Sequence, residues 1–420
     1  MSCPRRAALL AGLSLLCTAH AAQPDPGESP SVAPPAPAAA SLSFVPVPEI
    51  DLDPNSGNTF GLIGVWLQND AAGAIQRIYA PDVIHNPYFG WGARARVFDY
   101  SSTDSQWSVV AGAKQHVESE FDALYQSGLK RQDAFSYTVE AVYDRSGSPR
   151  FYGVGNDTHQ NDQSVYTNAQ HYLAAQIGWN FMPHWQLAYS LTPREVTVLP
   201  GQIPGIPSTT QAYPGVQGLG TTHEILNRLL LSYDTRDDVT VPRRGTAVVL
   251  YGGIASNQSG LFDGSLFSET GFDARYFWSP AAASTLALHA AARYMPSFVN
   301  APFWALSSVG GDSSAIGGGL LLRGYGAGRF YDRNAFSASL ELRQDVAAYE
   351  ALGTRIEVQL APFVDAGQVF HSGGDSPVAH LHSVFGLGVR ALARPSVVGY
   401  VDVGHASEGF VAFSGINYPF

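Results

Sequence analysis

"HYLAAQIGWNFMPHWQLAYSL", residues 171–191, carries the pattern that decides the fold. Every second residue from 173 to 181 is apolar, whereas Gln176 and Asn180 fall on the opposite face of an extended chain. A turn at 182–184 follows, and the same alternation then resumes, with aromatic residues close to the turn. A strand with lipid on one side and water on the other needs one apolar face, one polar face and an aromatic border.

Segments of this kind recur from about residue 58 to the end of the sequence. We expect sixteen of them, near 58–69, 74–84, 89–100, 105–118, 134–145, 165–181, 183–198, 225–236, 245–258, 265–279, 284–296, 334–348, 354–370, 381–393, 397–404 and 408–420. The long connections, near 146–164, 199–224 and 297–333, follow odd-numbered segments, and most of the others are short. Short periplasmic turns and longer outer loops are typical of outer-membrane barrels.

The sequence therefore predicts an all-β protein in which residues 58–420 form a 16-stranded antiparallel transmembrane β-barrel. An even number of strands places both ends of the barrel on the periplasmic side. A large exported β-helix or β-sandwich is the soluble alternative, but strands this long with aromatic rims are unusual in such folds.

The N-terminal residues predict export. Arg5 and Arg6 precede an apolar run at 7–17, and Ala19-His20-Ala21 forms an A-x-A cleavage site, so residues 1–21 are predicted to be a signal peptide. Residues 22–57 are rich in proline and alanine and are predicted to be a flexible periplasmic linker. We therefore expect the protein in the bacterial outer membrane.

Composition excludes several other classes of protein. Both cysteines, Cys3 and Cys17, lie in the predicted signal, so a disulfide-stapled fold is excluded. Without Arg5 and Arg6 the chain keeps 22 of its 24 basic residues against 35 acidic ones, a balance of −13. This negative net charge argues against a nucleic-acid-binding protein, because such proteins carry a basic surface. Outer-membrane lipid and lipopolysaccharide are the expected surroundings of the apolar face.

A glycine-rich loop at 297–333 carries Arg323. The lumen of a sixteen-stranded barrel is too wide for strand side chains to fill, so we expect this long extracellular loop to fold back into it. An arginine buried there needs a carboxylate partner, and period-2 alternation points Glu341 and Asp365 inward on the next two strands. A mobile, solvated outer loop is the alternative. A phosphate-binding loop is disfavoured because no Gly-Lys-Ser/Thr follows the glycines.

Four short motifs resemble a known family. The motifs are "LRGY" at 322–325, "SLELR" at 339–343, "FVDAG" at 363–367 and "YDTRDDVTVPRRG" at 233–245. They are similar, in sequence and in order, to motifs of the BamA/TamA-type superfamily, which includes two-partner-secretion transporters and bacterial surface antigens. The resemblance implies a sixteen-stranded barrel in which the loop arginine contacts inward carboxylates on strands twelve and thirteen.

The resemblance also implies roles for neighbouring residues. Gly324 would let the loop tip turn tightly, Tyr325 would pack against the lumen wall, and Gly367 would leave room beside the loop. Asp234 and Arg236 would form a structural turn on the periplasmic side, with an ordinary surface ion pair as the alternative.

The last residues of the sequence form a separate signal. Phe420 is expected to share a strand face with Tyr418, Ile416 and Phe410. A terminal aromatic residue on an alternating strand resembles the signature by which outer-membrane barrels are recognised during assembly.

Two functions stay open. The first is a stand-alone barrel that translocates or inserts a client, with a seam between segments 58–69 and 408–420. Family members usually carry POTRA domains that receive the client. Here only the linker precedes the barrel, so a protein or lipid client would need a separate periplasmic delivery factor. The second is a passive outer-membrane pore for solutes.

An outer-membrane enzyme is disfavoured. His171 and His289 have no evident nucleophile beside them in the sequence pattern. No metal-binding spacing such as H-E-x-x-H is present. We therefore predict no catalytic residue, no metal site and no cofactor.

Overall fold

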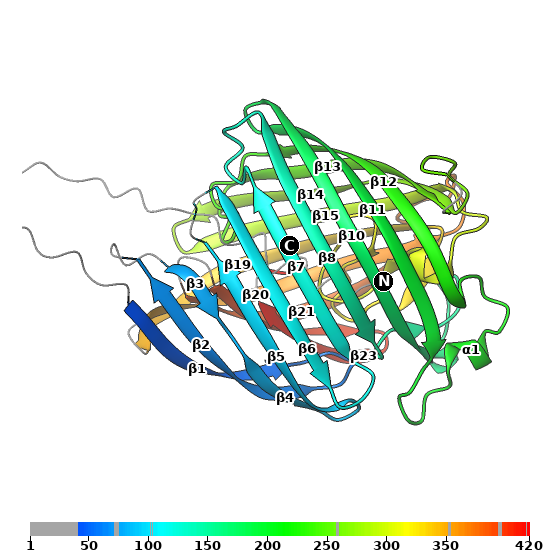
Figure 1. Ribbon diagram of the computed structural model, residues 1–420, viewed down its shortest axis with the longest axis horizontal. Coiled ribbons are helices and arrows are strands. Elements are labelled where there is room, and N and C mark those ends of the chain that lie inside the picture. The colour runs from blue at the N-terminus through cyan, green and yellow to red at the C-terminus, as the bar shows by residue number, and fades with distance from the viewer. Residues whose placement is uncertain are drawn as a thin grey trace, which may run out of the picture.

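Strands wound obliquely around a common interior make up nearly all of the structure, a computed structural model (Figure 1). It describes residues 41–70, 75–100, 102, 104–257, 260–351, 354–393, 397–416 and 418–420. No helix in these ranges is long and apolar enough to cross a membrane. The predicted signal peptide and residues 22–40 of the predicted linker lie outside the described residues.

One antiparallel sheet contains twenty strands within the described ranges. They are β1 (Ser41–Asp51), β2 (Thr59–Asn69), β3 (Ile75–Tyr79), β4 (Asp82–Asn86), β5 (Gly90–Asp99), β6 (Ser105–Lys114), β7 (Ser119–Ser127), β8 (Phe135–Ser146), β9 (Arg150–Phe151), β10 (Ser164–Met182), β11 (Trp185–Pro200), β12 (Gly220–Asp234), β13 (Gly245–Ser256), β14 (Phe267–Ala281), β15 (Ser284–Ser297), β19 (Asn334–Ala351), β20 (Thr354–Phe370), β21 (His382–Ala393), β22 (Val397–Ala406) and β23 (Gly409–Ile416). Strands β3 and β4 share the place between β2 and β5, and β9 is a two-residue extension beside β10.

All sixteen predicted segments coincide with strands, and the antiparallel barrel prediction is confirmed. The predicted count is too low, because β1 and β7 were not foreseen. Strand β7 was missed because the segment predicted at 105–118 ends instead at Lys114, and a turn at 115–118 leads directly into β7.

Strand β1 corrects the predicted linker. Residues 41–51 are not a flexible connection, because they pair with the whole length of β2, for example Val47 with Ile63. Pro46 and Pro48 obscured the strand in the sequence. Proline is tolerated in a strand only where its missing N–H faces away from the neighbouring strand, as at the edge of a sheet.

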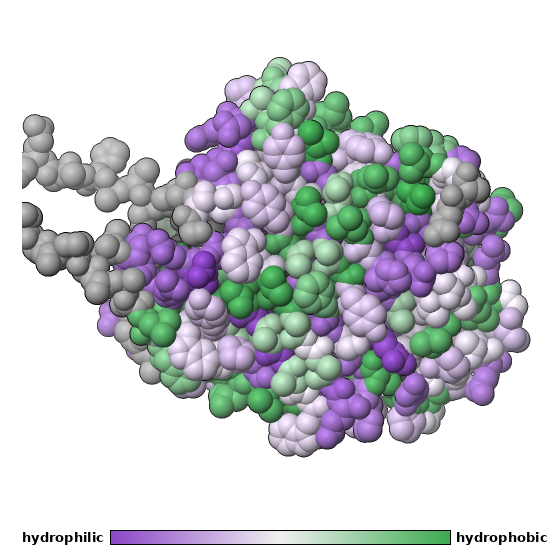
Figure 2. Space-filling model, viewed as in Figure 1, coloured by the Kyte–Doolittle hydropathy of each residue, from purple (hydrophilic) through white to green (hydrophobic). Residues whose placement is uncertain are grey.

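The alternation of side chains separates an outer from an inner face. Large apolar residues such as Leu173, Ile177 and Trp179 are about half exposed on the outside, whereas inward residues of the same strands are polar. Figure 2 shows hydrophobic side chains spread over this outer face. This is the arrangement that lipid outside and a polar interior require.

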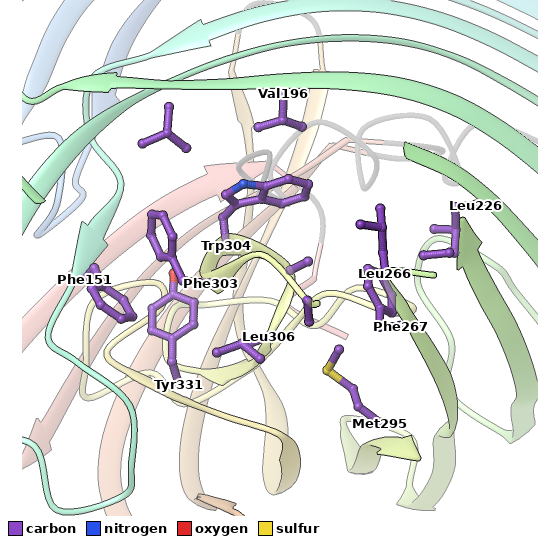
Figure 3. Packing of buried hydrophobic residues seen from close by; sticks show 14 of the residues in the cluster. Phe151, Val196, Leu226, Leu266, Phe267, Met295, Phe303, Trp304, Leu306 and Tyr331 are labelled. Carbon is purple, nitrogen blue, oxygen red and sulfur yellow. The ribbon is translucent and has the colours of Figure 1, made fainter. Parts of the chain in front are cut away.

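The segment 298–333, called the lumen loop below, packs against the inner face. It contains a short 3-10 helix η3 (Phe303–Ala305) and a three-stranded sheet of β16 (Ser307–Val309), β17 (Gly319–Leu320) and β18 (Phe330–Asp332). Figure 3 shows Trp304 next to Val196 of β11 and Phe303 between Phe151 and Tyr331. The main hydrophobic core of the protein therefore lies inside the sheet. The other connections carry a 3-10 helix η2 (Gln160–Asp162) and a short helix α1 (Thr209–Ala212).

Strands β1 and β23 meet where the cylinder closes. In the described part of the chain no register of paired residues joins them, but Ser414 connects them. Its main-chain N–H donates to the carbonyl of Leu52 (3.2 Å), and its hydroxyl donates to the carbonyl of Ile50 (2.9 Å) and accepts from the N–H of Leu52 (2.8 Å). The first strand of the seam is therefore β1 and not, as predicted, the segment 58–69.

A buried ion network at the tip of the lumen loop

Arg323 lies between β17 and β18 and is fully buried. Its guanidinium donates to both carboxylate oxygens of Asp365, from Nε at 2.9 Å and from Nη2 at 2.8 Å. Nη1 donates to Oε2 of Glu341 at 2.6 Å, and the main-chain N–H of Arg323 donates to Asp365 at 3.1 Å. The structure thus brings together the three charged residues that the sequence singled out, on the loop, on β19 and on β20.

Three further charged residues complete this network: Arg343, which belongs to the SLELR motif, and Asp402 and Arg390, which the sequence did not single out. Nη1 of Arg323 also reaches Asp402 of β22 at 3.1 Å. Arg390 of β21 donates to both Asp402 and Glu341, and Arg343 of β19 donates to Glu341 at 2.8 Å. Asp402 was detectable in principle, because it alternates with apolar, exposed neighbours on its strand. Its closeness to Arg323, 79 residues away, requires the closed barrel.

The network is electrically balanced. It comprises three guanidinium groups and three carboxylates, all at most 1% exposed: Arg323, Arg343, Arg390, Glu341, Asp365 and Asp402. Burial by itself lowers the pKa of Arg323, but the carboxylates of Asp365 and Glu341 raise it well above its ordinary value, so the loop arginine stays charged. Its guanidinium also stacks on the ring of Phe363 at 3.5 Å. This network, called the luminal ion network below, fixes the loop tip to three strands.

Two glycines make room for this contact. A Cβ atom on Gly324 would lie 2.7 Å from Val384 and 2.8 Å from Ala406, both on the barrel wall. A Cβ atom on Gly367 would lie 3.0 Å from Val309 of the lumen loop. Tyr325 is buried beside them and shares a hydrogen bond of 2.9 Å with the hydroxyl of Ser407. The loop tip and the wall therefore approach each other too closely for larger residues.

A second arginine holds the outer end of the same loop. Arg329 makes a bidentate contact with Glu408 in the turn between β22 and β23, with Nη2 at 2.6 Å from the carboxylate. It also donates to the carbonyl of Thr158 in the connection between β9 and β10 (2.6 Å). Its guanidinium lies over the rings of Tyr152 and Phe330. No pattern in the sequence indicates this clamp, because Glu408 and Thr158 lie in irregular connections between strands.

The end of the chain does not follow the predicted strand face. Strand β23 ends at Ile416, and Phe420 is only 5% exposed, whereas Phe410 on the same strand is 78% exposed. The Phe420 ring stacks on His289 (5.1 Å between centroids), and Tyr418 lies under Arg343 at 3.7 Å. The expectation that Phe420 and Phe410 share a face is wrong, because residues 418–420 turn into the lumen. Recognition of Phe420 during assembly stays a prediction.

Asp234 and Arg236 lie in the turn after β12, at the opposite end of the strands from the lumen loop. Nη2 of Arg236 is 2.6 Å from Oδ2 of Asp234, and its Nη1 donates to the carbonyl of Val239 at 3.3 Å. The pair therefore organises its own turn and has no contact with the luminal ion network.

Asp273, His289 and Ser339 lie side by side in the order of a hydrolase triad. His289 contacts Asp273 at 2.9 Å, and its cross-strand neighbour on β19 is Ser339. The hydroxyl of Ser339, however, donates to Asp365 at 2.6 Å and accepts from Arg323 at 2.9 Å. This serine belongs to the surroundings of the loop arginine. In the described ranges no group of three or more histidine, cysteine or acidic side chains is placed to hold a metal ion.

An antiparallel cylinder with an apolar exterior, a polar interior and a loop packed inside it defines a transmembrane β-barrel of the outer-membrane type. The family model described as "Omp85 superfamily domain" matches residues 98–392, and the chain belongs to the Omp85 superfamily. The resemblance seen in the motifs is thereby confirmed.

Solved structures are similar to this chain at low sequence identity, and the first of them shares its fold. BamA from Haemophilus ducreyi lacking POTRA domains 1–3 superposes with a TM-score of 0.54 and 12% identity, over 89% of this chain and 75% of that one. CdiB from Acinetobacter baumannii gives a TM-score of 0.44 and 10% identity, over 90% and 65% of the two chains. OccK5 (OpdH) from Pseudomonas aeruginosa gives 0.43 and 9%, over 90% and 96%. No curated protein sequence matches this chain.

Proposed function

We propose that this protein is an outer-membrane barrel that passes or inserts a client through the seam between β1 and β23. The contacts of Arg323 with Glu341 and Asp365 hold the lumen loop in place during this process. The client is a protein or a lipid, brought to the periplasmic side by a separate delivery factor. The observation that carries the proposal is the weak closure of the sheet.

Strand β1 is poorly equipped to bond to β23. The N–H and the carbonyl of Leu52 both bond to Ser414. Main-chain groups alternate in direction along a strand, so every second residue counted back from Leu52 directs its N–H and carbonyl towards the seam. Pro46 and Pro48 are among these residues, and proline has no N–H to donate to β23. Opposite them the chain of β23 has already turned inward, since its strand ends at Ile416. A seam with few ladder bonds opens at lower cost than any other strand pair in the barrel.

The luminal ion network lies beside this seam. Asp402 is on β22, the strand next to β23, and Arg329 holds the turn between these two strands through Glu408. The lumen loop is thus attached to the C-terminal wall of the seam. If a client displaced β23 from β1, the lumen loop would stay attached to β22 and to the turn between β22 and β23. This attachment supports a role for the network in keeping the lumen closed.

Reversible closure of the seam tests the proposal. Both native cysteines lie in the predicted signal, so Leu52→Cys with Ser414→Cys introduces an isolated pair at the point where the strands meet. The purified variant is placed in lipid vesicles, and folding of a urea-denatured eight-stranded outer-membrane barrel is followed by its heat-modifiable migration. We expect acceleration over empty vesicles under reducing conditions and its loss on oxidation. Equal rates in both states would refute the seam.

A passive solute pore is the second candidate. It is favoured by partly exposed polar side chains on the inner faces of β8 and β10, such as Glu140, Gln176 and Asn180. Single-channel recording separates the two functions. A large, steady, weakly selective current together with no effect of the oxidised seam would favour the pore.

A further inference from the structure

Strand β1 is displaced towards the periplasm relative to β23. Leu52, directly after the outer end of β1, bonds to Ser414, which lies near the periplasmic end of β23. Two residues of β23 follow Ser414, up to Ile416, whereas all eleven residues of β1 precede Leu52. Below the contact between Leu52 and Ser414, β1 therefore has almost no strand to pair with, and the joined part of the seam is its outer part.

The connection from β1 to β2, residues 52–58, is packed against the lumen loop. Its Asn55 is 6% exposed and donates from Nδ2 to the carbonyl of Ala327 at 2.8 Å. A Cβ atom on Gly326 would overlap Oδ1 of the same asparagine, so the two segments lie in direct contact. The N-terminal wall of the seam is thereby attached to the lumen loop.

The C-terminal wall is attached to the same few residues of the loop. Arg329 donates from Nε and Nη2 to the carboxylate of Glu408, in the turn between β22 and β23. Ala327 and Arg329 are two positions apart, so a short stretch of the lumen loop bonds to both walls of the seam. Residues 326–329 are called the bridging segment below.

A third element holds the bridging segment and the connection from β1 to β2 together. The chain between β8 and β10 supplies Arg150, whose Nη2 donates to the carbonyl of Asn55 at 2.6 Å. It also supplies the carbonyl of Thr158, which accepts from Nη2 of Arg329 at 2.6 Å. Arg150 and Arg329 are each 2% exposed. Hydrogen bonds shielded from water in this way are costly to break, because the released groups find no water to replace their partners.

The two parts of the seam therefore differ in how firmly they are closed. In the outer part, the contacts of Asn55, Arg329 and Ser414 join the walls directly or through the bridging segment. In the periplasmic part, the described residues pair β1 only with β2, and Pro46 and Pro48 offer no N–H to a further strand. Local opening begins where a structure has the fewest bonds, which here is the periplasmic end of the seam.

We infer that the bridging segment keeps the outer part of the seam closed, so that the barrel opens from its periplasmic end. The inference rests on the proposed function in one respect, because it takes the seam as the place where the barrel opens. It adds the direction of opening and the contacts that have to break before the walls separate completely, those of Asn55 with Ala327 and of Arg329 with Glu408. An opening of this kind leads from the periplasm into the bilayer and leaves the walls joined at the outer surface.

Distances between pairs of spin labels on the full-length protein in lipid nanodiscs test the inference. The outer pair is Asn58→Cys with Phe410→Cys, and the periplasmic pair is Phe44→Cys with Val401→Cys, all at exposed positions on the two walls. We expect a narrow distance distribution for the outer pair and a broad one for the periplasmic pair. Equal widths for the two pairs in the otherwise wild-type protein would overturn the inference.

Variants of the bridging contacts locate the effect. Asn55→Ala with Arg329→Ala should raise the population with a widened outer pair by about tenfold or more, since a buried hydrogen bond to a charged group is worth more than one factor of ten. Asn55→Ala alone keeps the Arg329 contacts and should fall between this variant and the wild type. Arg333→Ala is the matched control, because its guanidinium donates to main-chain carbonyls of β15. An outer pair as narrow in the double variant as in the wild type would refute the bridging segment.

This measurement contains no client and is independent of the folding assay with Leu52→Cys and Ser414→Cys. If oxidation of that pair stops client folding while the outer pair stays narrow in the double variant, the proposed function stands and the bridging segment is refuted. If the outer pair widens but oxidation has no effect, the bridging segment stands and the passage of a client through the seam is refuted.

Discussion

At the scale of single residues, the chemistry of the loop tip requires arginine. Arg323 uses Nε, Nη1 and Nη2 at once, on Asp365, Glu341 and Asp402. A lysine has the same charge but cannot present three donors in one plane. The flat guanidinium also stacks on Phe363, which an ammonium group would not do in the same way. Charge, shape and burial thus select the same residue.

Arg323→Ala should lower the free energy of unfolding by about 3–5 kcal/mol, because it leaves buried carboxylates without their counter-ion. Arg323→Lys should fall between the wild type and the alanine variant. The measurement is the urea midpoint of the purified barrel in detergent, followed by heat-modifiable migration. Arg333→Ala is the control, since Arg333 lies in the same loop and its guanidinium donates to main-chain carbonyls, those of Met295 and Pro296. A midpoint unchanged in Arg323→Ala would show that the network adds nothing to stability.

Part of this site could be predicted from the sequence and part could not. The alternation of apolar and polar residues along two adjacent strands was enough to predict that Glu341 and Asp365 face the loop. Arg343 ends the SLELR motif, but its contact with Glu341 on the same strand was not foreseen. Arg390 and Asp402 reach the site from β21 and β22. Their distance from Arg323 depends on the curvature and stagger of the sheet, which an alternating sequence pattern does not predict.

At the scale of elements, alternation located strands well wherever one face meets lipid and the other meets polar groups. It failed at β1, where Pro46 and Pro48 interrupt the pattern, and at the end of β23. There the alternation of Phe410 and Phe420 continues in the sequence while the backbone leaves the sheet after Ile416. Tertiary contacts explain this departure from the sheet. Phe420 packs between His289 and the luminal arginines, where it gains more contact than on the outer face.

Phe420→Ala should therefore destabilise the folded barrel by about 3–5 kcal/mol, the usual cost of removing a buried phenylalanine. Phe410 lies on β23 and is exposed, so Phe410→Ala should lower the free energy of unfolding far less in detergent. Both are measured as urea midpoints of refolded protein, together with the amount of barrel found in outer membranes of expressing cells. If Phe420 acts only as an assembly signal, its loss will reduce the amount in membranes and leave the midpoint unchanged.

At the scale of the whole molecule, the interior has two unlike halves. The half lined by β19 to β22 is occupied by the lumen loop and neutralised by three arginines and three acids. The inner faces of β8 and β10 carry partly exposed polar side chains instead, among them Glu140, Gln176 and Asn180. The sequence indicated an acidic chain and an inward loop. The division between the halves follows from how the cylinder closes and could not be derived from strand patterns.

The lumen loop is held at two points, and the current through the barrel should report on both. Arg323 fixes its tip to β19, β20 and β22, and Arg329 fixes its outer end to Glu408 and Thr158. Either contact alone keeps most of the loop inside, because the packed side chains between them hold it as well. In planar bilayers we expect a small conductance for the wild type and brief larger openings for Arg323→Ala or Arg329→Ala. The double variant should show a steady conductance several times larger than either single variant.

Arg243→Ala is the matched control for this measurement. Arg243 forms an ion pair with Asp345 at 3.4 Å on the side of the barrel away from the loop, where both side chains are more than a quarter exposed. Its removal should leave the conductance at the wild-type level, since surface ion pairs of this kind contribute little. A double variant that conducts like the wild type would mean that the loop does not control passage.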